Sequence, residues 1–376
     1  MRKRAKALGL TILFVLATAA SAPARAAPQL EPKVVLVTFD GVRWQDIFRG
    51  ADPKLMNDPA YVNPDIKSDV IGPAYLDVAD RASALTPFLH GVMAKDGVLL
   101  GNRDKGECAK VANDLWFSYP GYNEFQTGRP DPNLTGNGKT PNPNVTFLEY
   151  LQTQPRYHGK VSMVGAWDVF PYIVNTQRTD VPVNIGFNGT YPTDVKTARE
   201  GMRLLEKHDQ RAVYIAFGDT DEFAHAGDYA HYLMALERGD DFLRQVWDYL
   251  QSDPYYRGQT TLMVLTDHGR GETPTEAWRE HGSSRAYKLT PKDFPQYNET
   301  GVVGSDNVWF AAMGPGVKRD VASGPGAGEC LHSAQVAASL VTALGEDWRA
   351  FSRQSAHDQA APPFPFIGAP TPPSAP

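Results

Sequence analysis

Short apolar runs that alternate with helical patterns are the feature that most restricts how this sequence can fold. Five runs are rich in β-branched residues and bounded by Gly, Asp or Pro: 33–39, 160–165, 211–217, 260–265 and 307–313. Patterns typical of helices occupy 81–95, 146–152, 194–208, 230–251 and 333–344. Strands that alternate with helices indicate a largely parallel sheet with helices on both faces, so we predict an α/β fold.

Acidic and imidazole residues follow several of these runs. They are Asp40, Asp221, His225, Asp267, His268 and His281. In a parallel sheet, sites form outside the carboxyl ends of the strands, so one edge of the sheet would gather most of these side chains. Carboxylate and imidazole ligands without thiolates suit Zn²⁺, with Mn²⁺ as a possible substitute. The sequence therefore predicts a site for two divalent metal ions.

Each of these residues also has an ordinary explanation when it is taken alone. An Asp-Gly pair such as Asp40-Gly41 is typical of a turn. Asp221 and His225 are four residues apart, which suits an ion pair on one helix face. Asp219 competes with Asp221 because it directly ends the strand, but only Asp221 stands four residues before a histidine. We favour metal binding because it explains all of these residues at once, whereas a separate ordinary explanation would have to be true for each of them.

A second motif starts at Ser118 and reads Ser-Tyr-Pro-Gly-Tyr-Asn-Glu-Phe-Gln-Thr-Gly. With this motif and the acid and imidazole residues, the chain resembles the alkaline phosphatase superfamily, particularly its nucleotide pyrophosphatase/phosphodiesterase and sulfatase branches. Their nucleophile is followed by Pro two residues on and by Thr-Gly at nine and ten. The resemblance places the nucleophile at Ser118, and a turn hydroxyl before Pro120 is the alternative.

The resemblance spans about 33 to 316 and implies an alkaline-phosphatase-like sandwich with loop or cap insertions. It also implies two ligand sets. Asp40, Ser118, Asp267 and His268 would hold one metal ion, and Asp221, His225 and His281 the other. His281 lies only 13 residues after His268, which is similar to the metal-dependent phosphoglycerate mutase and phosphopentomutase branch.

Departures from the family pattern restrict the substrate. Sulfatases of this superfamily need Arg four residues after the nucleophile, where this chain has Tyr122, so a formylglycine sulfatase is not expected. Five other residues are candidates for substrate binding. The Asn-rich loop at 136–144 would offer Asn142 or Asn144, with Asn137 as a third choice, and Arg129 and Arg270 would clamp a phosphate. The alternatives are turn formation for the asparagines and a solvated surface position for the arginines.

Tryptophans near the motifs are candidates for an apolar pocket that takes part of the substrate. They are Trp44, Trp116, Trp167 and Trp278. Core packing is the commoner role of a tryptophan, and it stays open for each of them.

The composition of the sequence divides the chain into three predicted segments. Residues 1–26 have a basic start, an apolar stretch and Ala24-Arg25-Ala26 at the end, so they predict a cleaved signal peptide. Residues 27–360 would form a single catalytic domain, with cap insertions among the aperiodic stretches 49–79, 170–193 and 273–306. Residues 361–376 contain seven prolines and predict a disordered tail.

The export signal predicts a periplasmic or secreted bacterial protein. Loss of the leader, which has five basic and no acidic residues, takes the formal net charge from −6 to −11. This charge argues against binding to nucleic acid, and no later run is long enough to cross a membrane. Cys108 and Cys330 are the only cysteines, and the sequence leaves open whether they form a disulfide bond.

These observations predict a secreted two-metal hydrolase of small phosphate esters, a monoesterase or diesterase, acting through a phosphoserine intermediate. The alternatives are a phosphoryl transferase like phosphoglycerate mutase or phosphopentomutase, and a metal-stabilised binding module without catalysis. The oligomeric state stays open.

Overall fold

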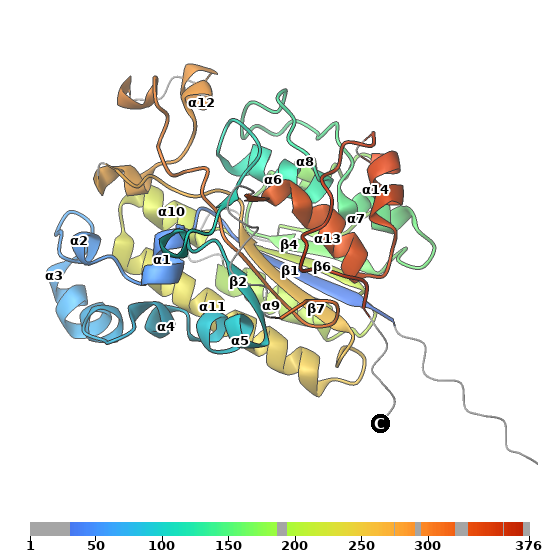
Figure 1. Ribbon diagram of the computed structural model, residues 1–376, viewed down its shortest axis with the longest axis horizontal. Coiled ribbons are helices and arrows are strands. Elements are labelled where there is room, and N and C mark those ends of the chain that lie inside the picture. The colour runs from blue at the N-terminus through green and yellow to red at the C-terminus, as the bar shows by residue number, and fades with distance from the viewer. Residues whose placement is uncertain are drawn as a thin grey trace, which may run out of the picture. The chain divides into compact units, whose positions relative to one another are not determined.

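A seven-stranded sheet lies at the centre of the fold, in the order β2-β8-β7-β1-β6-β4-β5 (Figure 1). The computed structural model describes residues 31–185, 194–273, 275–289, 295–319, 330–355 and 357–370. The strands are β1 (Lys33–Phe39), β2 (Gly97–Leu100), β4 (Val161–Gly165), β5 (Val183–Asn184), β6 (Ala212–Phe217), β7 (Thr260–Thr266) and β8 (Phe310–Met313). β8 is antiparallel to its neighbours β7 and β2, and the other pairs are parallel. The predicted α/β fold with a largely parallel sheet is confirmed.

The central strands are buried on both faces, which explains their continuous apolar sequences. Every residue of β1, β6 and β7 is buried, and successive side chains point to opposite faces of the sheet. In β1, Val34 and Leu36 belong to one apolar core, whereas Val35 and Val37 belong to the other. The sequence therefore had to supply apolar residues at consecutive positions.

Helices cover both faces of the sheet (Figure 1). Residues of α6 (Ser118–Thr127), α7 (Phe147–Thr153), α13 (Val336–Ala343) and α14 (Trp348–Ser355) pack in the core that contains Leu36. Residues of α1 (Trp44–Arg49), α9 (Asp194–Leu205) and α11 (Tyr229–Ser252) pack in the core that contains Val37. None of the described helices is both long and apolar enough to cross a membrane.

Short helical elements connect the main strands and helices. They are α2 (Pro53–Met56), α3 (Pro64–Ile66), η1 (Lys67–Leu76), α4 (Arg81–Leu85), η2 (Leu89–Met93), α5 (Ala94–Asp96), η3 (Arg103–Lys105), α8 (Phe170–Ile173), α10 (Asp219–Ala226), η4 (Thr275–Arg279), α12 (Ser284–Leu289), η5 (Pro295–Tyr297) and η6 (Ser333–Gln335). The predicted helix at 81–95 is broken after α4, because Pro87 disfavours a helical conformation at Thr86. Residues 67–76 form a π-helix, whose repeat differs from the 3.6 residues of an α-helix.

The C-terminal segment packs on the domain over part of the predicted disordered tail. Phe364 and Phe366 are each 1% exposed. The Phe364 N–H donates to Ser339 Oγ, and the Phe366 carbonyl accepts the Lys318 N–H. The prediction of disorder is therefore wrong for residues 361–370, because aromatic residues between the prolines supply buried surface. Residues 371–376 and the predicted signal peptide lie outside the described residues.

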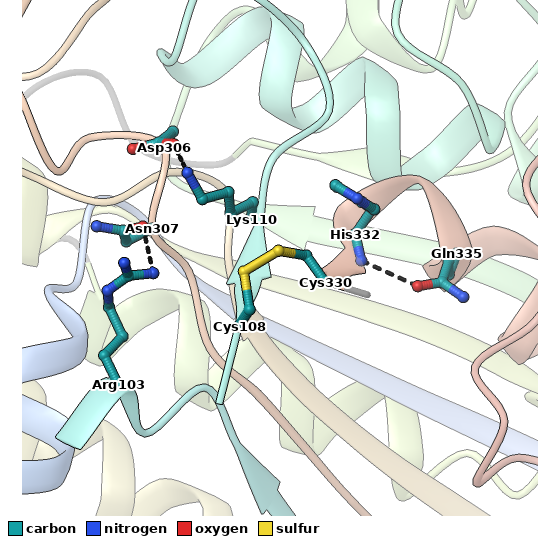
Figure 2. The surroundings of a disulfide bond; sticks show 8 residues. All are labelled: Arg103, Cys108, Lys110, Asp306, Asn307, Cys330, His332 and Gln335. Atoms are coloured by element: carbon teal, nitrogen blue, oxygen red, sulfur yellow. Dashed lines mark hydrogen bonds and ion pairs between the residues drawn. A yellow bond between two sulfur atoms is a disulfide. The ribbon is translucent and has the colours of Figure 1, made fainter. Parts of the chain in front are cut away.

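A disulfide bond joins Cys108 and Cys330, which are 222 residues apart in sequence (Figure 2). The cysteines adjoin β3 (Ala109–Lys110) and β9 (Leu331–His332), which pair as a small parallel sheet. Lys110 Nζ lies 2.5 Å from Asp306 Oδ2, and Figure 2 shows this ion pair near the disulfide bond. The bond thus ties the N-terminal half of the domain to its C-terminal helices.

Removal of this bond should lower stability. A loop this long loses much conformational freedom when it is closed, and deletion of a native disulfide typically costs about 2–5 kcal/mol. We expect the Cys108→Ser, Cys330→Ser double variant to show that decrease in the free energy of unfolding in urea. A reductant should destabilise the parent protein and leave the double variant unchanged. Equal stability of the two oxidised proteins would contradict the expectation.

Asp240 of α11 makes the stability of the fold depend on pH. Its carboxylate accepts the backbone N–H groups of Phe88 and Leu89 at 2.7 and 2.9 Å, and burial raises the pKa of Asp240 to about 6. The folded state therefore holds this proton more tightly than the unfolded state, so the stabilisation is complete below pH ~4 and is lost as the pH rises through about 6. Between pH 4 and 7 the parent should lose about 2 kcal/mol relative to Asp240→Asn in urea unfolding. Parallel pH profiles would contradict this account.

Candidate metal centre

Three adjacent strands bring the predicted ligands to one edge of the sheet. Asp40 directly follows β1, α10 starts two residues after β6, and Asp267 directly follows β7. In the sheet β1 lies between β7 and β6, so the ligands converge although Asp40 and Asp267 are 227 residues apart in sequence. The topology, rather than any local motif, builds the site.

The first group consists of Asp40, Asp267 and His268. His268 Nε2 lies 3.3 Å from Asp40 Oδ1 and 3.4 Å from Asp267 Oδ2. Ser118 Oγ lies 3.3 Å from the same nitrogen. These are the four residues that the resemblance assigns to one metal ion.

The second group consists of Asp221, His225 and His281. His225 Nε2 lies 3.0 Å from His281 Nε2 and 3.3 Å from Asp221 Oδ2. The spacing of four residues places Asp221 and His225 on one face of α10, as predicted. Asp219, the rival of Asp221, belongs to neither group.

All three imidazoles present Nε2 to the centre because Nδ1 is engaged elsewhere. His268 Nδ1 lies 2.9 Å from the Gly269 carbonyl, and His281 Nδ1 lies 3.3 Å from the Trp116 carbonyl. His225 Nδ1 lies 3.7 Å from Glu280 Oε2. A partner on Nδ1 that leaves Nε2 available is the arrangement typical of histidine metal ligands.

Several buried atoms of the first group fit a bound cation. Asp40 Oδ1 and Asp267 Oδ2 are buried and have no hydrogen-bond partner, although buried carboxylate oxygens are normally paired. Burial raises the pKa of Asp40, and the nearby Asp221 raises it further. Burial and Asp40 raise the pKa of Asp267 well above its ordinary range. A divalent cation would satisfy both carboxylates.

The electrostatics of the two groups differ. Burial opposes a charge on His268, but Asp267 and Asp40 raise the pKa of this imidazole to about 9. Burial would raise the pKa of Asp221, but the Arg270 guanidinium holds it well below its ordinary value. Burial also lowers the pKa of His281, which favours the neutral form that binds metals.

Ser118 is the first residue of α6, a helix in which all ten residues are buried. Gly121 allows this helix to approach β7, because a Cβ atom there would lie 2.5 Å from the Asp267 carbonyl oxygen. The buried Glu124 accepts backbone N–H groups of Ala112, Asn113 and Ala334. These contacts fix the position of the serine.

A cavity of about 490 Å³ opens beside both groups. Its lining includes Asp40, Ser118, Asp221, His225 and His281 from the predicted site, and also Tyr122, Asn137, Ala166, Trp167, Phe170, Ala216, Phe217, Gly218 and Glu222. Trp167 is thus the one tryptophan of the predicted four that lines this cavity, while Trp44 lines another. Asn137 Oδ1 accepts the Tyr119 N–H at 2.9 Å.

Four predicted substrate-binding residues do not line the cavity, which corrects the sequence prediction. The amide of Asn142 donates to Asn123 Oδ1 and the Ile173 carbonyl. Asn144 donates to Asp131 and accepts from Arg129. These hydrogen bonds join the loop at 136–144 to Asn123 of α6 and to neighbouring segments.

Arg270 is the fourth of these residues. It is 1% exposed and donates to both the side chain and the carbonyl of Asp221, and also to the Arg279 carbonyl. The guanidinium therefore holds α10 against the loop after β7 and is not directed at a phosphate. Its position next to the Asp-His-Gly motif did not reveal this role, because Asp221 is far away in sequence.

Two polar residues of the cavity were not predicted to contribute to the site. The buried Tyr122 hydroxyl donates to Asp40 Oδ2 at 3.0 Å, and Glu222 lines the cavity from α10. Tyr122 stands at the position where the resemblance calls for an arginine in sulfatases, which is a signal that this tyrosine contributes to the site. No pattern in the sequence singles out Glu222, which is one of three acidic residues in the first turn of α10.

Comparisons with known proteins identify a matching family and similar folds. A family model described as the metalloenzyme superfamily matches residues 140–285. The chain is similar in structure to murine ectonucleotide pyrophosphatase/phosphodiesterase 5, with a TM-score of 0.51 and 14% identity over 88% of this chain and 97% of that chain. It is also similar to Ps i-CgsB in complex with k-i-k-neocarrahexaose, with a TM-score of 0.51 and 14% identity over 89% and 75% of the two chains. No curated protein matches the sequence.

The solved structures establish a shared fold, since their identity to this chain is too low to carry more. The segment that matches the family model contains five of the six predicted acid and imidazole ligands, and Asp40 lies outside it. Together with the fold, this match confirms the resemblance predicted from the motifs.

Replacement of Asp40 should affect metal binding and stability in opposite directions. Asp40→Asn removes one of the facing buried carboxylates, so the metal-free variant should be more stable than the parent by about 1–3 kcal/mol. The same variant should gain less stability from added Zn²⁺ because a ligand oxygen is lost. Urea unfolding with a chelator and with Zn²⁺ measures both effects. Asp248→Asn, on the exposed side of α11, should change neither, and a metal-free Asp40→Asn protein that is less stable than the parent would contradict the account.

Proposed function

We propose that this protein, whose motifs and fold are those of the alkaline phosphatase superfamily, is an exported, metal-dependent hydrolase of small phosphate esters. The observation that carries the proposal is the position of Ser118, whose hydroxyl lies 3.3 Å from His268 Nε2 at the junction of a buried helix and the first ligand group. A hydroxyl at that place has a clear use as a nucleophile. The same cavity offers space for an ester of moderate size.

Two divalent ions, most simply Zn²⁺, fit the two ligand groups. Asp40, Ser118, Asp267 and His268 would hold one ion, and Asp221, His225 and His281 the other. When bound, such ions lower the pKa of a serine hydroxyl and neutralise charge on the phosphoryl oxygens.

The reaction then proceeds in two steps at Ser118. Its hydroxyl loses a proton to solvent, and Oγ forms a bond to phosphorus while the bond from phosphorus to the ester oxygen breaks. The leaving alcohol takes a proton from solvent. Water then attacks the phosphoserine and releases the phosphate product, which returns Ser118 to its hydroxyl form. Asn137, from the Asn-rich loop at 136–144, lines the cavity and would orient the phosphoryl group.

Phosphodiesters are the substrates that the cavity favours. A diester carries one negative charge near neutral pH, whereas a monoester carries up to two. The described lining of the cavity contains no lysine or arginine, and Arg270 is engaged with Asp221. With few protein cations to offset a second charge, the less charged ester is the better ligand.

Export is part of the proposal. Residues 1–26 have the pattern of a signal peptide, and the disulfide bond between Cys108 and Cys330 suits an oxidising compartment such as the periplasm.

Loss of the Ser118 hydroxyl should abolish hydrolysis. We expect Ser118→Ala, loaded with Zn²⁺, to hydrolyse bis(4-nitrophenyl) phosphate at least about 10³-fold more slowly than the parent, because the nucleophile is missing. Release of 4-nitrophenolate measures the rate, and Ser68→Ala, at an exposed site on η1, is the matched control.

Other outcomes distinguish the alternatives. Full activity of Ser118→Ala would refute the serine mechanism. Transfer of a phosphoryl group between positions of a sugar phosphate without hydrolysis of any ester would favour the mutase alternative. Bound metal without either reaction would favour a binding module.

A further inference from the structure

We propose that a groove between α9 and α11 binds a small molecule that combines an acidic group with an apolar body. The groove has a volume of about 380 Å³, and small-molecule sites typically have about 300–1,000 Å³. It is distinct from the cavity beside the two ligand groups, and Phe217 is the one described residue that lines both. This inference does not depend on the proposed function.

One face of each helix forms the groove. The lining residues recur at intervals of three or four along each helix, and residues with that spacing lie on one helix face. They include Asp194, Ala198 and Met202 on α9, and Ala235, Arg238 and Phe242 on α11. The two helices therefore present their lining side chains to the same space.

The floor of the groove is apolar and fixed. Phe217 is 2% exposed, and its ring centroid lies 5.2 Å from that of Phe242 in edge-to-face geometry. Met202 is half-buried beside them. Val195, which also lines the groove, is 44% exposed and is one of four large apolar side chains that are exposed in the described parts of the chain. A ligand with an apolar body would remove this surface from water, which is favourable.

Two arginines determine which ligands suit the apolar floor. Arg199 lines the groove from α9 and the half-buried Arg238 lines it from α11. Within the residues that the structure describes, neither arginine forms an ion pair or a side-chain hydrogen bond, although Arg203 on α9 and Arg244 on α11 are both paired. A guanidinium group binds a carboxylate or a similar anion through two parallel hydrogen bonds. Two unpaired arginines above an apolar floor therefore favour an amphiphilic anion.

The acidic residues near the groove do not neutralise these arginines. The Asp194 carboxyl accepts the backbone N–H groups of Gly218 and Asp219 at 2.9 and 3.0 Å. Burial and the nearby Asp219 raise the pKa of Asp194 well above its ordinary value, so these two carboxyls together carry less than two negative charges. Asp241 lies 3.8 Å from Arg244 Nε on the same helix. Three arginines thus face Asp241 and this carboxyl pair, which leaves the groove with an excess of positive charge.

Two probes of the same shape test the groove. Naphthalene-2-carboxylate carries a negative charge, and naphthalene-2-carboxamide is its neutral counterpart. Calorimetry with the protein, both with and without Zn²⁺, should show about tenfold tighter binding of the carboxylate, because hydrogen bonds between two charged groups are the stronger ones. Arg199→Gln and Arg238→Gln should each reduce the ratio of the two affinities toward one.

Controls separate the charge from the apolar contact and from the metal centre. Val195→Asn removes only apolar surface, so it should weaken both probes and leave the ratio unchanged. Arg203→Gln, on α9 but outside the groove, should change neither affinity. Removal of Zn²⁺ with a chelator should leave binding in the groove intact, whereas a carboxylate bound at the metal centre would be lost.

Several outcomes would overturn the proposal. They are equal affinities of the parent for both probes, a ratio that stays unchanged in both arginine variants, loss of carboxylate binding on chelation, and no binding of either probe. None of these results bears on the hydrolase proposal, which is tested by the activity of Ser118→Ala. Failure of one proposal is therefore distinguishable from failure of the other.

Discussion

The convergence of buried carboxylates at the ends of three parallel strands is the constraint on which the rest of the structure depends. Asp40 and Asp267 are both buried, and each has an oxygen without a hydrogen-bond partner. Two like charges that are withdrawn from water destabilise each other unless a cation or a proton joins them. The fold therefore maintains an arrangement that costs free energy in the protein alone, which is typical of a site for ligand binding rather than of a structural core.

The surrounding residues limit this cost and fix the geometry. Tyr122 donates a hydrogen bond to Asp40, and the Gly41 N–H donates to Asp267 Oδ1 at 3.0 Å. Gly41 is required at that turn, since its φ is +61° and a Cβ atom would lie 2.7 Å from Asp221 Oδ1. Arg270 fixes Asp221 from the opposite side. Together these contacts hold both ligand groups at one edge of the sheet, with the cavity beside them.

Much of this architecture was predictable, because strands and ligands leave separate local signals. The five predicted strands all exist, and β1, β6 and β7 carry ligands at the ends where they were expected. Fully buried strands have continuous apolar sequences, so the end of such a strand and the polar residue after it can be located in the sequence. The pairing of Asp221 with His225 could be predicted from helix geometry alone, because residues four apart lie on one face of a helix.

What the sequence concealed depends on contacts between distant segments. Arg270 and Asn144 were expected to bind a phosphate. In the folded chain Arg270 is instead hydrogen-bonded to Asp221 and Asn144 to Asp131, and the sequence alone does not show these contacts. The proline content at 361–370 suggested disorder, whereas Phe364 and Phe366 decide the outcome by filling the core beside α13.

The position of Arg270 has a consequence for how metal and substrate binding are coupled. Because this guanidinium is engaged with Asp221, and because no lysine or arginine is among the described residues that line the cavity, the proposed function requires bound cations to supply the positive charge that attracts a phosphate ester. Affinity for the ester and affinity for the metal ions are then linked, and each must raise the other by the same factor.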